Sequence, residues 1–262
     1  MPYLPRIARA DLHFWEEPCI SGDKGSGAIF FSGCSLKCVF CQNFDISHKD
    51  MGKTVSVKEL ADIFKMLEDK GAHNINFVNP THYTYAIEKA LEIYKPKIPL
   101  VYNSGGYDLT ETIKKDIFDI YLFDLKYLSS DTALLYSGAA DYPQFAKDTI
   151  ITACKIKGEP VYINGIMQSG VIVRHLVLPR HTNEAISVAD WVFDNVPWAV
   201  FSLMAQYIPL GNADKYPEIN RKITQREYDK VVNYISDKRT DNIYIQDLPS
   251  ADACYVPDFN LK

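Results

Sequence analysis

The stretch "GAIFFSGCSLKCVFCQN", residues 27–43, joins a short apolar run to three closely spaced cysteines. The run 27–33 predicts a buried β-strand ending at a glycine, because near-continuous apolar residues suit a strand that is covered on both faces. The following loop carries Cys34, Cys38 and Cys41 in the spacing C-x3-C-x2-C. The sequence therefore predicts a strand that delivers three thiols to one edge of a sheet.

The rest of the chain alternates apolar runs with stretches of helical periodicity. The helix expected over 54–71 has Ser56 as a candidate N-cap, Glu59 three residues later and Gly71 as its stop. The predicted strands are 27–33, 74–80, 98–103, 118–126, 171–179 and 198–207, and the predicted helices are 54–71, 83–95, 109–117, 143–156, 183–196 and 224–238.

Six such units predict an α/β fold, a partial (β/α)6 TIM-like barrel of parallel strands. The length of 262 residues suits one large domain, and no linker or low-complexity tract divides the chain. We expect a single domain over 1–262, with its core at about 27–210 and a C-terminal helix and tail over 211–262.

The composition excludes several partners. The formal net charge is -5 and the pI is about 5.7, which argues against a grip on nucleic acid through phosphate contacts. No apolar run approaches the roughly 20 residues of a membrane span, and residues 1–18 lack the apolar stretch of a signal peptide. We therefore expect no nucleic acid and no membrane as partner, and a cytoplasmic protein whose six cysteines are reduced.

Polar side chains follow the predicted strands at their carboxyl ends, where α/β folds place their chemistry. A single polar residue there has an ordinary structural explanation, but polar groups at six successive strand ends indicate a shared site. The candidates after the first strand's cysteines are Asn79, Thr81 and His82, then Asn103 and Ser104, then Asp124 and Lys126, then Arg174 and His175, and finally Gln206 and Tyr207.

The three cysteines have three interpretations: unrelated thiols, part of a zinc site, or ligands of an iron–sulfur cluster. Zinc sites usually combine two C-x2-C pairs, and Cys19, Cys154 and Cys254 have no partner cysteine nearby in the sequence. Thiolates bind [4Fe–4S] clusters well. Three ligands on such a cluster leave one iron open for a molecule that binds reversibly.

The cysteine spacing after a first barrel strand resembles the signature of the radical S-adenosylmethionine (SAM) superfamily, including an aromatic residue, Phe40, before the third cysteine. The chain is most similar to the activating enzymes of glycyl radical enzymes, typified by pyruvate formate-lyase activating enzyme, and to an iron–sulfur subfamily described as its homologue. The matching stretches are EEPCISGDKGSGAIFFSGCSLKCVFCQNFDIS, GAHNINFVNPTHY, VYNSGGY, DIYLFDLKY, LLYSGAADY, VIVRHLVLPRH and YPEINRKIT, which span residues 16 to about 223.

The resemblance implies a radical SAM oxidoreductase whose [4Fe–4S] cluster is held by the three cysteines. SAM would bind the open iron and be cleaved reductively to methionine and a 5′-deoxyadenosyl radical, which abstracts hydrogen from a substrate. Lys126 would contact the SAM carboxylate, Asp124 would help to bind a monovalent cation, and Arg174 would face the same cofactor. Asn103 and Ser104 match an Asp-Thr pair of the activating enzymes.

The chain departs from the family pattern at three places. Where the superfamily often has Gly-Gly-Glu for the SAM amino group, this chain has Asn79-Pro80-Thr81, so the contacts would come from the Asn79 carbonyls and the Thr81 hydroxyl. Asn103 replaces an acidic residue of the expected cation site. Gln206 stands where a histidine near the adenine is often found.

Three functions follow from these residues. The first is activation of a glycyl radical enzyme, with a protein or peptide substrate and a flavodoxin or ferredoxin-type electron donor. The second is radical modification of another peptide or a small molecule, and the third is a non-catalytic iron–sulfur or zinc protein. The ordered Asp124, Lys126 and Arg174 disfavour the third, and a barrel open on one side, partly covered by segment 239–262, favours an extended peptide.

Overall fold

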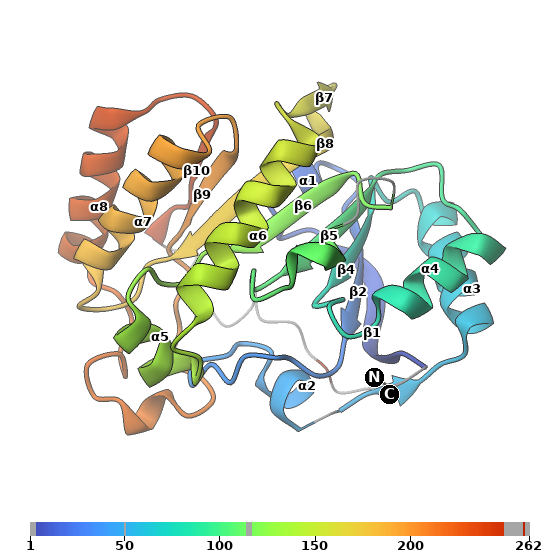
Figure 1. Cartoon of the computed structure of the whole chain (residues 1–262), viewed down its shortest axis with the longest axis horizontal. Coiled ribbons are helices and arrows are strands. Elements are labelled where there is room, and N and C mark those ends of the chain that lie inside the picture. The colour runs from blue at the N-terminus through green and yellow to red at the C-terminus, as the bar shows by residue number, and fades with distance from the viewer. Residues whose placement is uncertain (1–3, 50, 114–116, 249–258, 260–262) are drawn as a thin grey trace.

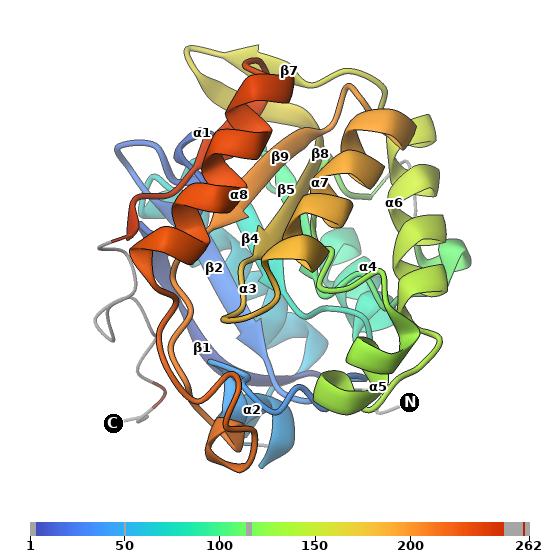
Figure 2. The same cartoon turned by 90° about the vertical axis from the view of Figure 1, so that its left-hand side faces the viewer.

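The computed structural model describes residues 4–49, 51–113, 117–248 and 259. It is an α/β fold in which one curved sheet carries helices on its outer face (Figures 1 and 2). The strands are β1 (Arg6–His13), β2 (Ser26–Phe31), β3 (Lys53–Thr54), β4 (Ile75–Val78), β5 (Leu100–Ser104), β6 (Ile120–Asp124), β7 (Val161–Ile163), β8 (Ile166–Leu176), β9 (Val200–Met204) and β10 (Ile243–Ile245). The helices are α1 (Pro18–Ser21), α2 (Phe44–His48), α3 (Val57–Asp69), α4 (Thr84–Ile93), α5 (Ser130–Ser137), α6 (Tyr142–Lys157), α7 (Thr182–Asn195) and α8 (Gln225–Lys238), with 3-10 turns at Thr110–Thr112 and Ala213–Lys215.

The sheet has the strand order β10-β9-β8-β6-β5-β4-β2-β1-β3, with β7 paired to β8 outside this path. The strands from β2 to β10 along this order pair in parallel, whereas β1 pairs antiparallel with both β2 and β3. The order is linear, with β10 at one end and β3 at the other. The predicted partial parallel barrel, open on one side, is therefore confirmed.

The local signals in the sequence explain most of the elements. Ser56 and Glu59 form the expected capping box, in which the Ser56 hydroxyl accepts from the Glu59 amide and the Glu59 carboxylate accepts from the Ser56 amide. Every residue of β2 and β5 is buried, which accounts for their near-continuous apolar sequence. The apolar face of α3 packs into the core through Leu60, Phe64 and Leu67.

Two expectations about the elements were wrong. The helix predicted over 109–117 is a 3-10 turn at Thr110–Thr112, and residues 114–116 lie outside the described residues. The parallel sheet also gains a seventh strand, β10, from the region expected to hold only a helix and tail. This strand is three residues long, too short for its apolar pattern to predict it against the surrounding charges.

The amino end of the barrel is closed by the connection between β1 and β2. Cys19 and Ile20 of α1 are buried among inward-facing side chains of the barrel strands. These partners are Val101, Ile120, Leu122, Met167, Ile172 and Val200. In the part of the chain that the structure describes, α1 therefore packs into the amino end of the barrel, opposite the carboxyl end where the cysteine loop lies.

Of the C-terminal segment expected to cover part of the open side, the structure describes residues 239–248 and Phe259. Phe259 is buried and its ring lies 5.5 Å from that of Phe30 on β2. Residues 249–258, with Asp252 and Cys254, lie outside the described residues. Among the described residues, none of the helices combines the length and apolar character needed to cross a bilayer.

Candidate active site

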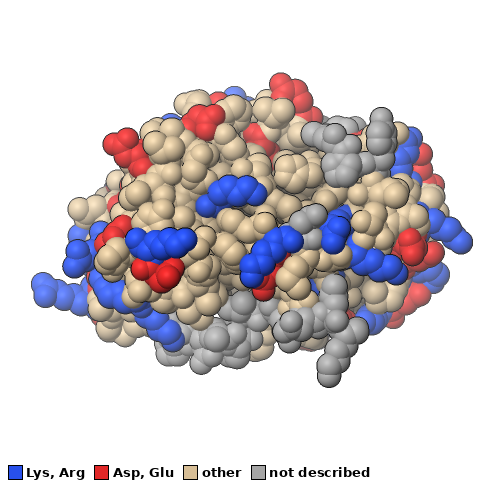
Figure 3. Space-filling view, turned by 90° about the horizontal axis from the view of Figure 1, so that it is seen from below, with Lys and Arg blue, Asp and Glu red and all other residues tan. Residues whose placement is uncertain are grey.

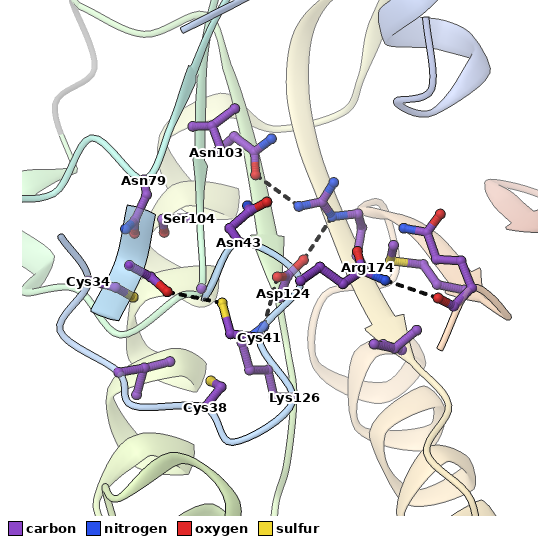
Figure 4. A pocket seen from close by; sticks show the side chains of 18 of the residues that line it. Cys34, Cys38, Cys41, Asn43, Asn79, Asn103, Ser104, Asp124, Lys126 and Arg174 are labelled. Carbon is purple, nitrogen blue, oxygen red and sulfur yellow. Dashed lines mark hydrogen bonds and ion pairs between the residues drawn. The ribbon is translucent and has the colours of Figure 1, made fainter. Parts of the chain in front are cut away.

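A cavity of about 230 Å³ occupies the carboxyl end of the barrel (Figure 4). Side chains from β2, β4, β5, β6, β8 and β9 and their following loops line it, together with residues of the β1–α1 connection. The residues predicted from the sequence that line this cavity are Cys34, Cys38, Phe40, Cys41, Asn79, Asn103, Ser104, Asp124, Lys126, Arg174 and Gln206.

The cysteine loop is held by main-chain hydrogen bonds to α2 and to the end of α5. Gly33 starts the loop with φ of 89°, a conformation that glycine adopts without strain, and its amide donates to the Ile46 carbonyl. The amides of Lys37 and Val39 donate to the carbonyls of Ser137 and Tyr136, at 3.1 and 2.8 Å. The loop is therefore fixed against the end of α5 rather than projecting freely.

The three thiols face the same space (Figure 4), and none of them forms a disulfide. Cys38 Sγ lies 3.0 Å from the Ser137 hydroxyl, and Cys41 Sγ lies 3.2 Å from the Ser47 hydroxyl. Burial raises the pKa of the Cys38 thiol to about 12, with neighbouring Lys126 acting in the opposite direction. Burial also raises the pKa of the Cys41 thiol. Without a metal Cys38 and Cys41 are therefore neutral thiols, and ligation would release their protons.

Whether an iron–sulfur cluster fits depends on the donor set. Among the residues that the structure describes, no group of three or more His, Cys, Asp or Glu side chains is arranged to hold a single metal ion. The loop nevertheless supplies three free thiols to one cavity, beside a lysine and two hydroxyl groups. Thiolates with hydrogen-bond donors around them are the usual environment of such clusters. The residues present fit the group.

Asp124, Lys126 and Arg174 form one ion network in the cavity (Figure 4). Asp124 Oδ2 accepts from Lys126 Nζ at 2.8 Å, and Asp124 Oδ1 accepts from Arg174 Nε at 2.8 Å. Although burial alone would raise it, the two cations hold the pKa of Asp124 at about 2. The carboxylate in turn raises the pKa of Lys126 above its ordinary value, against the effect of burial, so all three groups are charged.

The backbone of this segment is fixed by Tyr142 of α6. The Tyr142 hydroxyl donates to the Asp124 carbonyl at 2.6 Å and accepts from the Lys126 amide at 2.8 Å. His175, also predicted at this edge, is buried, and its Nδ1 bonds to the Leu125 carbonyl at 2.7 Å. Burial lowers the pKa of His175 to about 4, so this histidine is a neutral group that supports the same turn.

Two acidic residues that the sequence patterns did not indicate complete the network from the amino-end side of the barrel. Glu16 Oε2 accepts from Arg174 Nη1 at 2.8 Å, and Glu16 Oε1 accepts from the side-chain amides of Asn76 and Asn103 at 3.1 and 3.3 Å. Glu17 is buried beside them, with Oε2 3.9 Å from Arg174 Nη1. Burial and the charge of Glu16 raise the pKa of Glu17. Both lie between β1 and α1, and they reach the site because this connection packs across the amino end of the barrel.

The expected monovalent cation at Asp124 stays a prediction, and the geometry bears on it. Both oxygens of Asp124 already accept hydrogen bonds from protein cations. Asn103 Oδ1, the other expected partner, accepts from Arg174 Nη2 at 2.8 Å. The Arg174 guanidinium therefore lies between the two side chains that the resemblance assigned to a metal cation.

Thr81 and Ser104 both bind the carboxylate of Asp108. Thr81 is not among the residues that line the cavity, and its hydroxyl donates to Asp108 Oδ1 at 2.6 Å. The Ser104 hydroxyl donates to Asp108 Oδ2 at 2.5 Å, and the Tyr102 hydroxyl donates to Oδ1 at 2.7 Å. The buried Asp108 carboxylate thus ties the ends of β4 and β5 together, a role that its loop position did not indicate.

Asn79, Gln206 and Phe40 remain at the cavity wall. Asn79 has φ of 62°, and its side-chain amide donates to the Gly33 carbonyl, which connects the end of β4 to the cysteine loop. The Gln206 carbonyl accepts from Gln42 Nε2 at 3.0 Å. Phe40 is buried with its ring edge-on to Tyr207 at 5.7 Å.

The fold is an open parallel barrel whose first parallel strand delivers three cysteines to a cavity. The cavity also holds the Lys–Asp–Arg ion network. These features define a class of α/β barrels with a cysteine-lined site. Within that class, the family model described as the radical SAM superfamily matches residues 28–191, and the chain belongs to this superfamily. It is also 34% identical over 245 residues to the protein named uncharacterized protein MJ0674 of Methanocaldococcus jannaschii, covering 89% of this chain and 68% of that protein.

Solved structures share the fold. Crystal structures of Streptococcus suis SuiB bound to S-adenosylmethionine and to the precursor peptide SuiA match with a TM-score of 0.57, at 17% and 18% identity. These matches cover 82% and 84% of this chain and 48% of SuiB, so the chain spans about half the length of SuiB. Methylornithine synthase (PylB) matches with a TM-score of 0.54 at 13% identity, over 83% of this chain and 63% of that protein.

Membership of the superfamily identifies the chain as a radical SAM enzyme and implies a [4Fe–4S] cluster and S-adenosylmethionine as its cofactors. The resemblance seen in the sequence is confirmed at this level. The narrower likeness to activating enzymes of glycyl radical enzymes is a matter for proposal.

Proposed function

We propose that this enzyme abstracts hydrogen from a peptide or protein segment, with a glycine Cα of a glycyl radical enzyme as the first candidate. The bound cofactors supply the chemistry: one electron and SAM give methionine and a 5′-deoxyadenosyl radical, which becomes 5′-deoxyadenosine when it takes a substrate hydrogen. The observation that carries the proposal is the cavity at the open barrel's carboxyl end, with three cysteines, Lys126 and Arg174 on its walls.

In this proposal each part of the cavity wall has its own task. The three cysteines hold the cluster, and Lys126, whose side chain is 20% exposed, keeps its charge beside them for the SAM carboxylate. Asp124 orients Lys126, while Arg174 is engaged by three acceptors and acts mainly to hold the wall in place. Leu36, Phe40 and other apolar side chains exclude water from the reacting centre.

The open side of the barrel supports an extended substrate. The cavity is lined by Gln246, which follows β10, by His13, the last residue of β1, and by Trp15 in the following connection, so its wall includes residues from both sides of the gap in the sheet. Trp15 is 57% exposed, which leaves an aromatic surface beside this opening. An opening between sheet edges suits a peptide loop better than the enclosed pocket that binds a small metabolite.

An acidic electron-transfer protein of the flavodoxin or ferredoxin type is the proposed reductant. Lys37 is exposed on the cysteine loop, where its ammonium group donates to the Cys34 carbonyl at 3.3 Å. The face seen from below in Figure 3 carries lysine and arginine side chains across its surface although the whole chain has a net charge of -5. Opposite charges on donor and acceptor would speed their encounter.

Glycine-containing peptides deuterated at Cα test the substrate. The anaerobically reconstituted and reduced enzyme is mixed with SAM and the peptide, and 5′-deoxyadenosine is analysed by mass spectrometry. We expect deuterium in the product. Transfer from a small molecule, with none from any glycyl-loop peptide, would favour the second function, radical modification of a small molecule.

A Lys126→Met variant tests the cofactor contact separately from the substrate. Loss of one charge-assisted hydrogen bond should weaken SAM binding by about 1–3 kcal/mol. Binding is read from the change that SAM causes in the EPR signal of the reduced cluster. Lys37→Met is the matched control, because it removes an exposed lysine of the cysteine loop that is not part of the ion network.

A further inference from the structure

Two of the three cysteine sulfurs touch a serine hydroxyl, each from a different helix. Cys38 Sγ lies 3.0 Å from Oγ of Ser137, the last residue of α5, and Cys41 Sγ lies 3.2 Å from Oγ of Ser47 in α2. Both serines are buried. Among the described residues, Cys34 Sγ has no side-chain hydroxyl within hydrogen-bond distance, so the three proposed ligands differ in their surroundings.

Each serine has a second polar partner. Ser137 Oγ lies 3.1 Å from the hydroxyl of Tyr127, whose ring is buried against Tyr142. Ser47 Oγ lies 2.8 Å from His48 Nδ1, with the Phe44 carbonyl as a more distant acceptor at 3.5 Å. The serines are therefore central members of two short chains, Tyr127–Ser137–Cys38 and His48–Ser47–Cys41.

Ligation of metal fixes the direction of both chains. A thiolate that binds iron has no proton, so it can only accept, and the serine hydroxyl must donate to it. A serine has one hydroxyl hydrogen, and once that is used, its oxygen is left to accept from the second partner. Tyr127 would then donate to Ser137, and His48 Nδ1–H would donate to Ser47.

We propose that these two chains raise the reduction potential of the cluster. Reduction adds one electron to a site partly removed from water, and O–H groups aimed at the ligating sulfurs stabilise the added negative charge. Tyr127 and His48 act through the serines by fixing which way each hydroxyl points. The inference rests on the cluster held by Cys34, Cys38 and Cys41 and is independent of the substrate.

The test is a potentiometric titration of the reconstituted protein, followed by EPR of the reduced cluster without SAM or substrate. In Ser137→Ala and in Ser47→Ala, the ratio of reduced to oxidised cluster at a fixed potential should fall about tenfold, a shift of about 59 mV for one electron. Ser137→Thr keeps the hydroxyl and should retain the parent potential. Ser26→Ala is the control, since it removes a buried hydroxyl that bonds Asn74 at 2.6 Å instead of a ligand.

Combined variants distinguish donation to sulfur from a general loss of packing. Ser137→Ala with Ser47→Ala should lower the ratio about a hundredfold, the product of two independent tenfold effects. Tyr127→Phe should lower the potential by itself but add nothing to Ser137→Ala, because it acts through that hydroxyl. Parent potentials in both alanine variants at full iron content would overturn the proposal. If Ser137→Ala fails to bind iron, unchanged potentials in Ser47→Ala and Tyr127→Phe would do the same.

Discussion

The rim and the floor of the cavity are held by different forces. The rim is the cysteine loop 33–43, which main-chain hydrogen bonds fasten to the end of α5 while its side chains are left for a cofactor. The floor is Arg174 with the carboxylates of Glu16, Glu17 and Asp124, where opposite charges meet across the barrel. The thiols of the rim are left available for a cofactor, whereas the charged groups of the floor already have partners within the protein.

The largest expected effect is at the rim. Cys38→Ala should abolish cluster binding, because one of three protein ligands is lost. Iron and sulfide content after anaerobic reconstitution measures this. Cys154→Ala is the matched control, since Cys154 is a buried cysteine of α6 outside the cavity, and this variant should bind the parent amount. Equal loss in both variants would show that the assay reports folding rather than ligation.

At the floor, Arg174→Met should lower the free energy of unfolding of the cluster-free protein by about 3–5 kcal/mol, since it takes the guanidinium away from the carboxylates of Glu16 and Glu17, whose side chains are 8% and 4% exposed. Denaturant titration gives the value. Lys126→Met should cost clearly less, because Asp124 then retains Arg174. Equal losses in the two variants would contradict the expected dependence of the floor on Arg174.

Acid should weaken the floor before the rim. The pKa of Asp124 is about 2 in the folded protein, below its ordinary value of 3.8. The unfolded chain therefore binds more protons between these values, and the stabilisation, present above about pH 4, is lost as the pH falls through about 2. The contribution is about 2 kcal/mol. Asp124→Asn should show a shallower decline of unfolding free energy between pH 5 and pH 2, and an unchanged slope would contradict it.

The smallest expected effect is that of monovalent cations. Because Arg174 lies between Asp124 and Asn103, SAM binding should be the same in potassium, sodium and tetramethylammonium chloride at equal ionic strength. EPR of the reduced cluster with SAM reads this directly. A requirement for potassium would show that an ion displaces the guanidinium, and the floor would then depend on a metal cation as well as on protein charges.

The rim could be predicted from the sequence far better than the floor. Cysteine spacing is a local property, and the apolar run before it placed the loop at a strand's carboxyl end. The Asp124 and Lys126 positions followed from the same reasoning. The contact of Thr81 did not, since Asp108, the carboxylate that accepts from its hydroxyl, comes from the loop after the next strand. Strand β10 was missed because three residues give too little periodicity.

The sequence by itself determined the class of fold, the cysteine loop and the cations that face it, because these depend on patterns within a few residues. Only the tertiary structure decided which charges meet. Glu16 lies 158 positions from Arg174 in the chain, and their contact exists because the β1–α1 connection folds under the barrel. Ser137 and Cys38 are 99 positions apart and meet because α5 packs on the cysteine loop. Such pairings depend on the packing of segments far apart in the chain, which no local pattern records.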